Sequence, residues 1–341
     1  MIPKTTTRTT LDPSIHHFLT THPTLTLGGP NLHHERQTHV QIFGITNHHH
    51  HHHHPAPIHR VEFTAIRGPH GTIPLRILYP SKPLSHPTNP ESNLTPALIY
   101  FHGGGYCVGS GDDFENGCRI LAEQAGVQVY LVEYKLAPEW QYPVQLDEYE
   151  CVVHWVRGEG GRVRGVDPGR VFGAGDSAGG NMTASVEMRL KDRGQKGLDG
   201  VFLLYPEARL PFGTEAAREN NTGLYLECNG IFSFAANYIP CGVSPDSRYI
   251  SPGQQPVEAL RDLSPVAVYT CGFDPLRDVG VEFASRLEEA GNEVIWRHYD
   301  TLSHGFLQLA PWSEAAMTAL KEVAGDVRQL AAKLEEGGRD E

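Results

Sequence analysis

The sequence predicts an α/β fold: a mainly parallel eight-stranded sheet flanked by helices, with a helical cap. From residue 61 onward, short runs rich in β-branched and aromatic residues alternate with longer stretches of helical periodicity. This alternation is typical of parallel strands joined by helices that cover both faces of the sheet. Two long segments, residues 1–60 and 206–263, do not fit the alternation, and we expect them to form the cap.

The strand-like runs give eight candidates for the sheet. The first two, residues 61–66 and 73–79, are joined by a short turn with Gly68 and Gly71, which favours an antiparallel hairpin. The other six are expected at residues 97–101, 128–134, 171–174, 201–205, 266–271 and 293–298. We expect the core to comprise residues 61–205 and 264–341, with an N-terminal cap segment at 1–60 and a cap insertion at 206–263.

Helical periodicity marks the segments between the later strands. Helices are expected at residues 117–125, 146–156, 178–192, 281–290 and 313–334. Another helix is expected to begin at Asp12-Pro13-Ser14, because an N-terminal capping residue followed by proline is a typical helix start.

Composition narrows the classes of function. The 341 residues include 28 Lys and Arg against 40 Asp and Glu, a net charge of −12, which argues against nucleic acid as a partner. No signal peptide and no long apolar run is present, so we expect neither export nor a membrane span. Six cysteines without CxxC spacing favour reduced thiols and a cytoplasmic location.

Histidine is unevenly distributed. Sixteen of the 20 histidines lie within the first 86 residues, and those from His48 to His54 are consecutive. A consecutive run cannot place its imidazoles on one face at ligand spacing, so we interpret it as a flexible low-complexity loop. Adventitious binding of soft divalent metals and an internal expression tag are the alternatives.

Residues 173–180 read G-A-G-D-S-A-G-G, a pattern that two unrelated classes of serine hydrolase share. Chymotrypsin-like proteases carry G-D-S-G-G, and α/β-hydrolases carry G-x-S-x-G on a strand-turn-helix. Ser177 follows a short strand and precedes a helical stretch, which favours the second class. In such a turn Gly175 and Gly179 allow a close approach of helix and strand, leaving the serine oxygen of Ser177 exposed above the sheet.

A second glycine-rich loop follows the strand at residues 97–101. Gly103, Gly104 and Gly105 could gather their N–H groups around an oxyanion, joined by the N–H of Ala178 after the candidate nucleophile. A plain glycine turn and a phosphate loop are the alternatives. The residues after Gly105 give neither phosphate-loop pattern, so we interpret the loop as an oxyanion hole.

An acid and a base are expected from the ends of the last two strands. Asp274 follows the seventh strand and His304 the eighth, and the carboxyl ends of parallel strands meet at one edge of the sheet. Asp278 and Asp300 are rival acids: we expect Asp278 to turn toward a helix or solvent and Asp300 to lie too close to the histidine in sequence. The rival base His298 lies in a strand-like run.

At these motifs the sequence resembles the hormone-sensitive lipase family of α/β-hydrolase carboxylesterases. The resemblance runs from about residue 60 to the C-terminus. The motifs that carry it are H-G-G-G (102–105), G-D-S-A-G-G (175–180), D-P-L-R-D (274–278) and H-G-F (304–306). Glu219-Asn220 and the stretch Tyr134 to Glu139 are also similar, although Lys135 stands where the family usually has Arg.

The resemblance implies a role for each motif residue. Ser177 would be the nucleophile, His304 the general base and acid, and Asp274 its orienting acid. Gly103, Gly104, Gly105 and Ala178 would form the oxyanion hole, supported by His102 and Asp176. The substrate would be a small-molecule ester, without metal or cofactor, and the family permits monomers and homodimers.

Three questions stay open at this stage. A lactonase or a deacetylase of a specialised metabolite would use the same triad, and a non-catalytic receptor can share the fold. Aromatic residues at 210–213 and 231–234 could line an acyl pocket or belong to the core.

Overall fold

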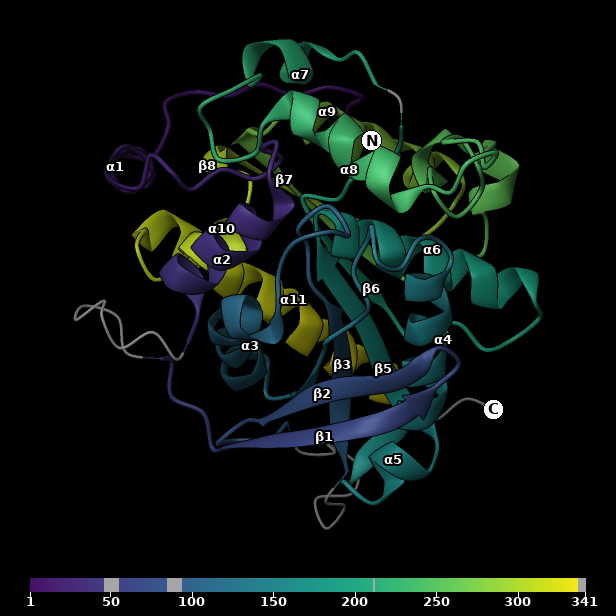
Figure 1. The fold of residues 1–341 in the computed structure, drawn as a ribbon. Coiled ribbons are helices and arrows are strands. Elements are labelled where there is room, and N and C mark those ends of the chain that lie inside the picture. Colours follow the sequence, from purple (N-terminus) through teal and green to yellow (C-terminus); the bar gives the residue numbers. More distant parts are fainter. Residues whose placement is uncertain (46–54, 85–93, 211, 337–341) are drawn as a thin grey trace.

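The computed structural model describes residues 1–45, 55–84, 94–210 and 212–336. Its centre is a sheet of eight strands in the order β1-β2-β4-β3-β5-β6-β7-β8, with helices on both sides (Figure 1). The predicted α/β class and the mainly parallel eight-stranded sheet are confirmed. The histidine run from His48 to His54, interpreted above as a loop, lies outside the described residues.

The first two strands form the expected antiparallel hairpin. β1 (Arg60–Gly68) pairs with β2 (Gly71–Tyr79), and the last pair of the ladder is Gly68 with Gly71. Gly71 has a φ of 111°, which glycine adopts without steric cost. β2 also pairs antiparallel with β4 (Gln128–Val132), so the hairpin forms one edge of an otherwise parallel sheet.

The other six predicted strands form the parallel part of the sheet. It contains β4, β3 (Thr95–Phe101), β5 (Val166–Asp176), β6 (Val201–Leu204), β7 (Val266–Phe273) and β8 (Val294–Ser303). Every residue of β3, β4, β6 and β7 is buried, because helices cover both faces. β5 and β8 are longer than predicted. The last residues of β8 are mostly polar, so the sequence pattern did not mark them as a strand. An edge strand tolerates such half-buried polar side chains.

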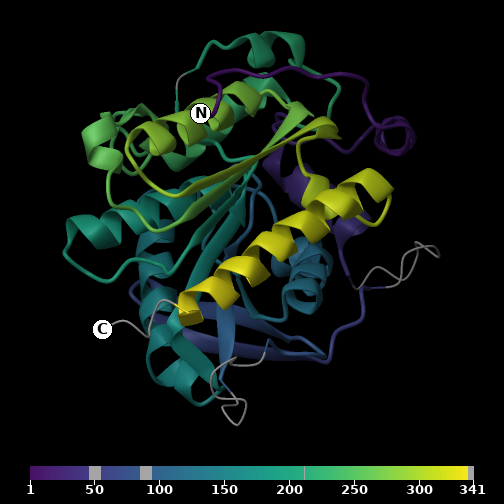
Figure 2. The same ribbon diagram turned by 180° about the vertical axis from the view of Figure 1, so that it is seen from behind.

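Helices form a layer on each face of this sheet. α3 (Gly111–Ala125) and α11 (Glu314–Glu336) pack against each other on one face, and α11 crosses the sheet diagonally (Figure 2). The other helices of these layers are α4 (Val144–Arg157), α6 (Ala178–Asp192) and α9 (Arg277–Glu289). Of these, α4 and α6 pack against β5, and α9 packs against β7. α3 and α9 begin earlier than predicted, because their first turns carry acidic residues that favour a helix start but interrupt the apolar pattern.

Four further helices among the described residues are short. They are α5 (Glu159–Arg162), α10 (Phe306–Leu309) and the 3₁₀ helices η1 (Pro252–Gln254) and η2 (Val257–Leu260). Within the described residues, no helix is long and apolar enough to span a membrane.

The two segments outside the alternation also form helices. α1 (Pro13–Thr21) begins as predicted after Asp12, whose carboxylate accepts from the backbone N–H groups of Ser14 and Ile15 at 3.0 Å. α2 (Leu32–Phe43) was not predicted, while α7 (Glu215–Glu219) and α8 (Cys228–Tyr238) belong to the expected cap insertion. A β-bridge between Leu27 and Leu226 joins the two segments. The division into core and cap stays a prediction.

Candidate active site

Ser177 lies in the sharp turn between β5 and α6. β5 ends at Asp176 and α6 begins at Ala178, so the serine has no helical or strand conformation of its own. Its φ of 54° and ψ of −120° fall in a region that costs a non-glycine residue about 1–3 kcal/mol. The Ser177 N–H donates to the Leu204 carbonyl at 2.8 Å, which holds the turn against the end of β6.

Two glycines allow this turn to form. A Cβ atom on Gly179 would collide with the carbonyl oxygen of Phe101 at the end of β3, and one on Gly175 would collide with the backbone of Gly179. The first turn of α6 therefore lies directly against two strands. Glycine is required here for close approach, since neither residue has a positive φ.

Asp274 and His304 come together where β7 and β8 end. His304 Nδ1 lies 2.8 Å from Asp274 Oδ2, and both side chains are 1% exposed. The second carboxylate oxygen of Asp274 accepts from the Leu276 N–H at 2.8 Å. Because the carboxylate can only accept, Nδ1 carries a proton, and in the neutral imidazole Nε2 then keeps its lone pair.

The buried Nε2 atom of His304 has no hydrogen-bond partner in the part of the chain that the structure describes. No hydrogen bond to Ser177 Oγ is described there either. A buried imidazole nitrogen without a partner is rare, because leaving such a group unsatisfied costs free energy. His304 therefore presents an acceptor that is free for a proton from a nucleophile or substrate.

The rival residues have other partners. Asp278 accepts from Arg277 Nε and from the Ala216 N–H, each at 2.9 Å. Of the two orientations expected, helix or solvent, the buried side chain takes the first, because it contacts the first turn of α7. The neighbouring guanidinium offsets the cost of burying this carboxylate. His298 contacts Thr270 Oγ1 at 3.0 Å and the Thr7 carbonyl at 2.7 Å.

The glycine loop after β3 lies beside the serine turn. A Cβ atom on Gly103 would be 3.0 Å from Ser177 Cβ. Gly104 and Gly105 have φ angles of 98° and 58°, which glycine adopts readily and other residues rarely do. In the described residues no partner is found for the N–H groups of Gly104, Gly105 and Ala178.

Gly103 differs from its neighbours in this respect. Its N–H donates to Asp176 Oδ1 at 2.9 Å and is therefore already engaged. The sequence pattern grouped all three glycines as oxyanion donors. The contact with Asp176 revises that grouping: Gly103 fixes the loop, and two loop N–H groups remain available.

Asp176 joins the glycine loop to the serine turn. Its Oδ1 atom also accepts from the Tyr100 hydroxyl at 2.9 Å. Burial raises the pKa of Asp176 to about 6, against which the two hydrogen bonds act.

His102 supports the same loop from below. Its ring stacks on Phe114 and Tyr134, with centroid distances of 4.9 and 4.4 Å. Its Nδ1 lies 2.8 Å from the Gly103 carbonyl, so this nitrogen donates. Burial lowers the pKa of His102 to about 4, and the ring is therefore neutral at neutral pH.

Sequence reasoning missed two residues that shape the site. The ring of Tyr205 meets that of His304 edge to face at 4.7 Å, and only its position after the sixth strand could have marked it. Arg36 on α2 donates to the Cys107 carbonyl at 2.7 Å and pairs with Glu139 at 2.7 Å. No local pattern could have revealed Arg36, because its partners lie 71 and 103 residues away.

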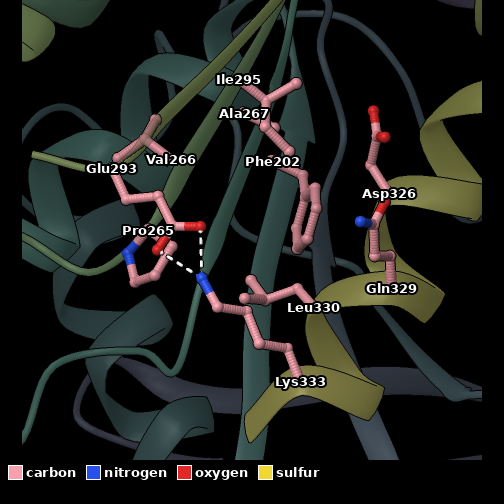
Figure 3. Close-up of a pocket in the computed structure, with 10 residues that line it drawn as sticks. All are labelled: Phe202, Pro265, Val266, Ala267, Glu293, Ile295, Asp326, Gln329, Leu330 and Lys333. Carbon is pink, nitrogen blue, oxygen red and sulfur yellow. Dashed lines mark hydrogen bonds and ion pairs between the residues drawn. The ribbon is translucent and has the colours of Figure 1, made fainter.

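A separate pocket lies at the opposite edge of the sheet, near the first residues of β6, β7 and β8 (Figure 3). Its volume is about 230 Å³, and α11 forms one wall. Its lining includes Phe202, Ile295 and Leu330, and an ion pair between Glu293 and Lys333 at 2.7 Å. Neither Ser177 nor His304 contributes to it, so it is not part of the candidate active site.

A family model described as alpha/beta hydrolase fold matches residues 98–308, which include Ser177, Asp274 and His304. The chain belongs to the α/β-hydrolase family. Among its relatives in this family is esterase LipI of Mycobacterium tuberculosis, 35% identical over 267 residues, which are 77% of this chain and 81% of LipI. Arylacetamide deacetylase of Bos taurus is 29% identical over 295 residues, covering 69% of this chain and 72% of the relative.

Solved structures of α/β-hydrolases agree with these relatives. An esterase of Rhizomucor miehei superimposes with a TM-score of 0.86 at 28% identity, covering 97% of this chain and 99% of the fungal one. The named relatives and structural neighbours are carboxylic ester hydrolases. The resemblance to hormone-sensitive lipases and their carboxylesterase relatives is confirmed.

Proposed function

We propose that this α/β-hydrolase is a serine carboxylesterase that hydrolyses short- to medium-chain or aryl esters through an acyl-enzyme. The observation that carries the proposal is the His304–Asp274 hydrogen bond, which leaves a buried Nε2 acceptor without a partner among the described residues, in a ring that packs on Tyr205. A buried base with a fixed tautomer is what a serine nucleophile needs.

In the first half-reaction Ser177 Oγ attacks the ester carbonyl while His304 Nε2 takes its proton. The tetrahedral oxyanion receives hydrogen bonds from the N–H groups of Gly104, Gly105 and Ala178, which have no partner among the described residues. His304 then gives its proton to the leaving alcohol. Asp274 keeps the imidazole in the Nδ1–H tautomer and stabilises its positive charge while the proton is held.

In the second half-reaction water attacks the acyl-enzyme. His304 takes a proton from the water, the same N–H groups hold the second oxyanion, and Ser177 Oγ leaves with the proton as the carboxylic acid forms. Base, nucleophile and oxyanion donors are all protein groups. The proposed reaction therefore uses no metal or organic cofactor.

Aromatic side chains of the expected cap insertion favour an apolar acyl or aryl group. Phe234 on α8 lies against Gly105, since a Cβ atom on that glycine would collide with its ring. Phe212 and Phe232 stack at 5.5 Å, and Phe232 is 41% exposed. We therefore propose that residues 206–263, with the N-terminal segment, act as a cap over the oxyanion loop.

A second candidate function is deacetylation of aryl acetamides, in which an amide bond is cleaved instead of an ester bond. It is favoured by the similarity to a relative named arylacetamide deacetylase. The same residues would act, with the amine leaving group taking the proton from His304. Comparison of phenyl acetate with acetanilide as substrates separates the two functions.

We place the protein in the cytoplasm as a monomer or homodimer. The six cysteines are all free, and Cys107, Cys118, Cys228 and Cys271 are buried. Reduced, buried thiols are typical of proteins from reducing compartments.

The proposal is tested by hydrolysis of p-nitrophenyl esters from acetate to palmitate, comparing wild type with Ser177→Ala. We expect activity on the short chains, an initial burst of p-nitrophenol, and a loss of about 10⁶-fold in kcat for the variant. A fold control is needed, so both proteins are compared by circular dichroism and thermal unfolding. A folded Ser177→Ala protein with substantial turnover would overturn the assignment.

A further inference from the structure

The backbone on both sides of the Asp274 turn is held by the side chain of one residue, Asn220. Asn220 follows α7 and is fully buried. Its Nδ2 atom donates to the Gly272 carbonyl at 3.2 Å and to the Asp274 carbonyl at 3.1 Å. One amide group therefore bridges the end of β7 and the residue whose carboxylate orients His304.

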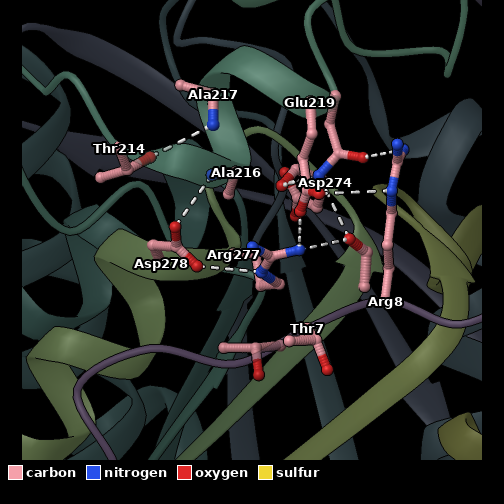
Figure 4. A network of polar contacts seen from close by, with 12 residues as sticks. Thr7, Arg8, Thr214, Ala216, Ala217, Glu219, Asp274, Arg277 and Asp278 are labelled. Carbon is pink, nitrogen blue, oxygen red and sulfur yellow. Dashed lines mark hydrogen bonds and ion pairs between the residues drawn. The ribbon is translucent and has the colours of Figure 1, made fainter.

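Arg8, near the start of the chain, sets the orientation of that amide. Asn220 Oδ1 accepts from Arg8 Nη1 at 2.7 Å. Figure 4 shows Arg8 in the same network of polar contacts as Glu219 and Arg277. A guanidinium can only donate, so it fixes the oxygen of Asn220 toward itself and turns the two N–H bonds toward the Asp274 turn. Arg8 also lies 3.6 Å from Glu219 and 5.0 Å from the centre of the Phe273 ring.

A second arginine anchors α7 to the same turn. Arg277 pairs with Glu219, and its Nη1 donates to the Gly272 carbonyl at 3.2 Å. Arg277 Nε donates to Asp278 at 2.9 Å, and the other oxygen of Asp278 accepts from the Ala216 N–H at 2.9 Å. The positive charges of Arg8 and Arg277 compensate the negative charges of Glu219 and Asp278 around the carbonyl of Gly272.

The segment that carries Arg8 is attached to β8. The N–H groups of Thr9 and Asp12 donate to the carbonyls of Asp300 and Thr301, at 3.2 and 2.9 Å. β8 ends at Ser303, directly before His304. Residues 7–12 therefore contact both strands whose ends supply the acid and the base.

We propose that Arg8 and Asn220 are positioning residues for Asp274, so that the N-terminal segment takes part in catalysis through the geometry of the acid. The inference rests on the proposed esterase function. Arg8 orients the Asn220 amide, the amide fixes the Asp274 backbone, and this backbone holds the carboxylate against His304. Neither residue touches the substrate.

The test combines Arg8→Met, Asn220→Ala and the double variant in steady-state hydrolysis of a short-chain p-nitrophenyl ester. We expect each single variant to lose about ten- to a hundredfold in kcat, with KM nearly unchanged, because the acid is misplaced while the substrate pocket is intact. Since Arg8 acts through Asn220, the kcat of the double variant should be no lower than that of the less active single variant.

Two further variants separate positioning from general support. Arg218→Gln is the matched control. Arg218 lies on α7, the helix that Asn220 follows, and donates to the Gly213 carbonyl on the surface, so the kcat of this variant should equal that of wild type. Arg8→Lys keeps the positive charge with one donor group and should recover part of the lost kcat. Thermal unfolding of each variant checks that the fold is retained.

The outcomes are distinct. Losses in the double variant that multiply, an unchanged kcat in Asn220→Ala, or an equal loss in Arg218→Gln would each overturn the inference. A fluorophosphonate probe read by intact mass gives an independent measure, because its reaction with Ser177 needs the same base. A wild-type protein that neither hydrolyses esters nor reacts with the probe would instead overturn the proposed function itself.

Discussion

The position of Gly105 requires a residue without a side chain. Its φ of 58° is unfavourable for other residues, and the ring of Phe234 occupies the space where a Cβ atom would lie. Two independent constraints, one on the backbone and one on packing, therefore act at the residue whose N–H we assign to the oxyanion. α8, which belongs to the proposed cap, contacts the proposed oxyanion loop at this point.

Gly105→Ala should lower kcat about a hundredfold, because the displaced loop loses a donor to the oxyanion. The measurement is steady-state hydrolysis of a short-chain ester. Gly325→Ala on α11 is the control, since its Cβ would meet no atom of the described residues within 4 Å and its φ is not positive. Equal activity of the two variants would remove Gly105 from the oxyanion hole.

Strand-end reasoning placed Asp274 and His304 at one edge of the sheet, and the structure describes their hydrogen bond. It could not separate Gly103 from Gly104 and Gly105, because a run of identical residues carries no information about which N–H is already engaged. The same reasoning could not identify Arg8. Its partner Asn220 lies 212 residues away, and a contact of that separation leaves no local pattern.

At the scale of elements, α2 is the clearest failure of the sequence pattern. The helix carries three histidines, and its apolar residues do not form a continuous stripe, so periodicity gave no signal. Its capping residue Asn31, whose side chain accepts from the His34 N–H at 3.1 Å, was the one available marker. α11 is the opposite case: its stripe of Leu320, Val323 and Val327 is fully buried, and the helix was predicted nearly to its ends.

Gly325 is a weak point in α11. A Cβ atom there would meet no atom of the described residues within 4 Å, so the glycine has no packing role among them. Gly325→Ala should raise the free energy of unfolding by about 0.5–1 kcal/mol, because alanine loses less conformational freedom in a helix. Urea unfolding followed by far-UV circular dichroism measures this. A lower stability would show that the helix backbone at this position is not free to accept a side chain.

On the scale of the whole molecule, buried carboxyl groups set the dependence of stability on pH. Burial raises the pKa of Glu35 to about 7 and those of Asp113 and Glu207 to about 8. In the unfolded chain these groups ionise near pH 4. Between the two values the folded protein binds more protons than the unfolded one, so its stability falls as pH rises.

The free energy of unfolding should therefore decrease between pH 6.5 and 8.5. Below this window, the lowered pKa values of His39 and His102, about 4 each, act in the opposite direction, because these rings are neutral when folded and protonated when unfolded. Urea unfolding at several pH values measures the slope. Glu207→Gln should make this slope smaller. A free energy of unfolding that rises with pH in this window would contradict the expectation.

The attachment of the first residues to the last strands has a consequence for how the chain is synthesised. Arg8 cannot contact Glu219 or Asn220 until these residues leave the ribosome, and Asp12 waits 301 residues for its contact with Ser313. At common translation rates the first of these delays lasts about 10 to 40 s. During that interval the N-terminal segment lacks these contacts, so the proposed support of the Asp274 turn by Arg8 can form only after residue 220 has been synthesised.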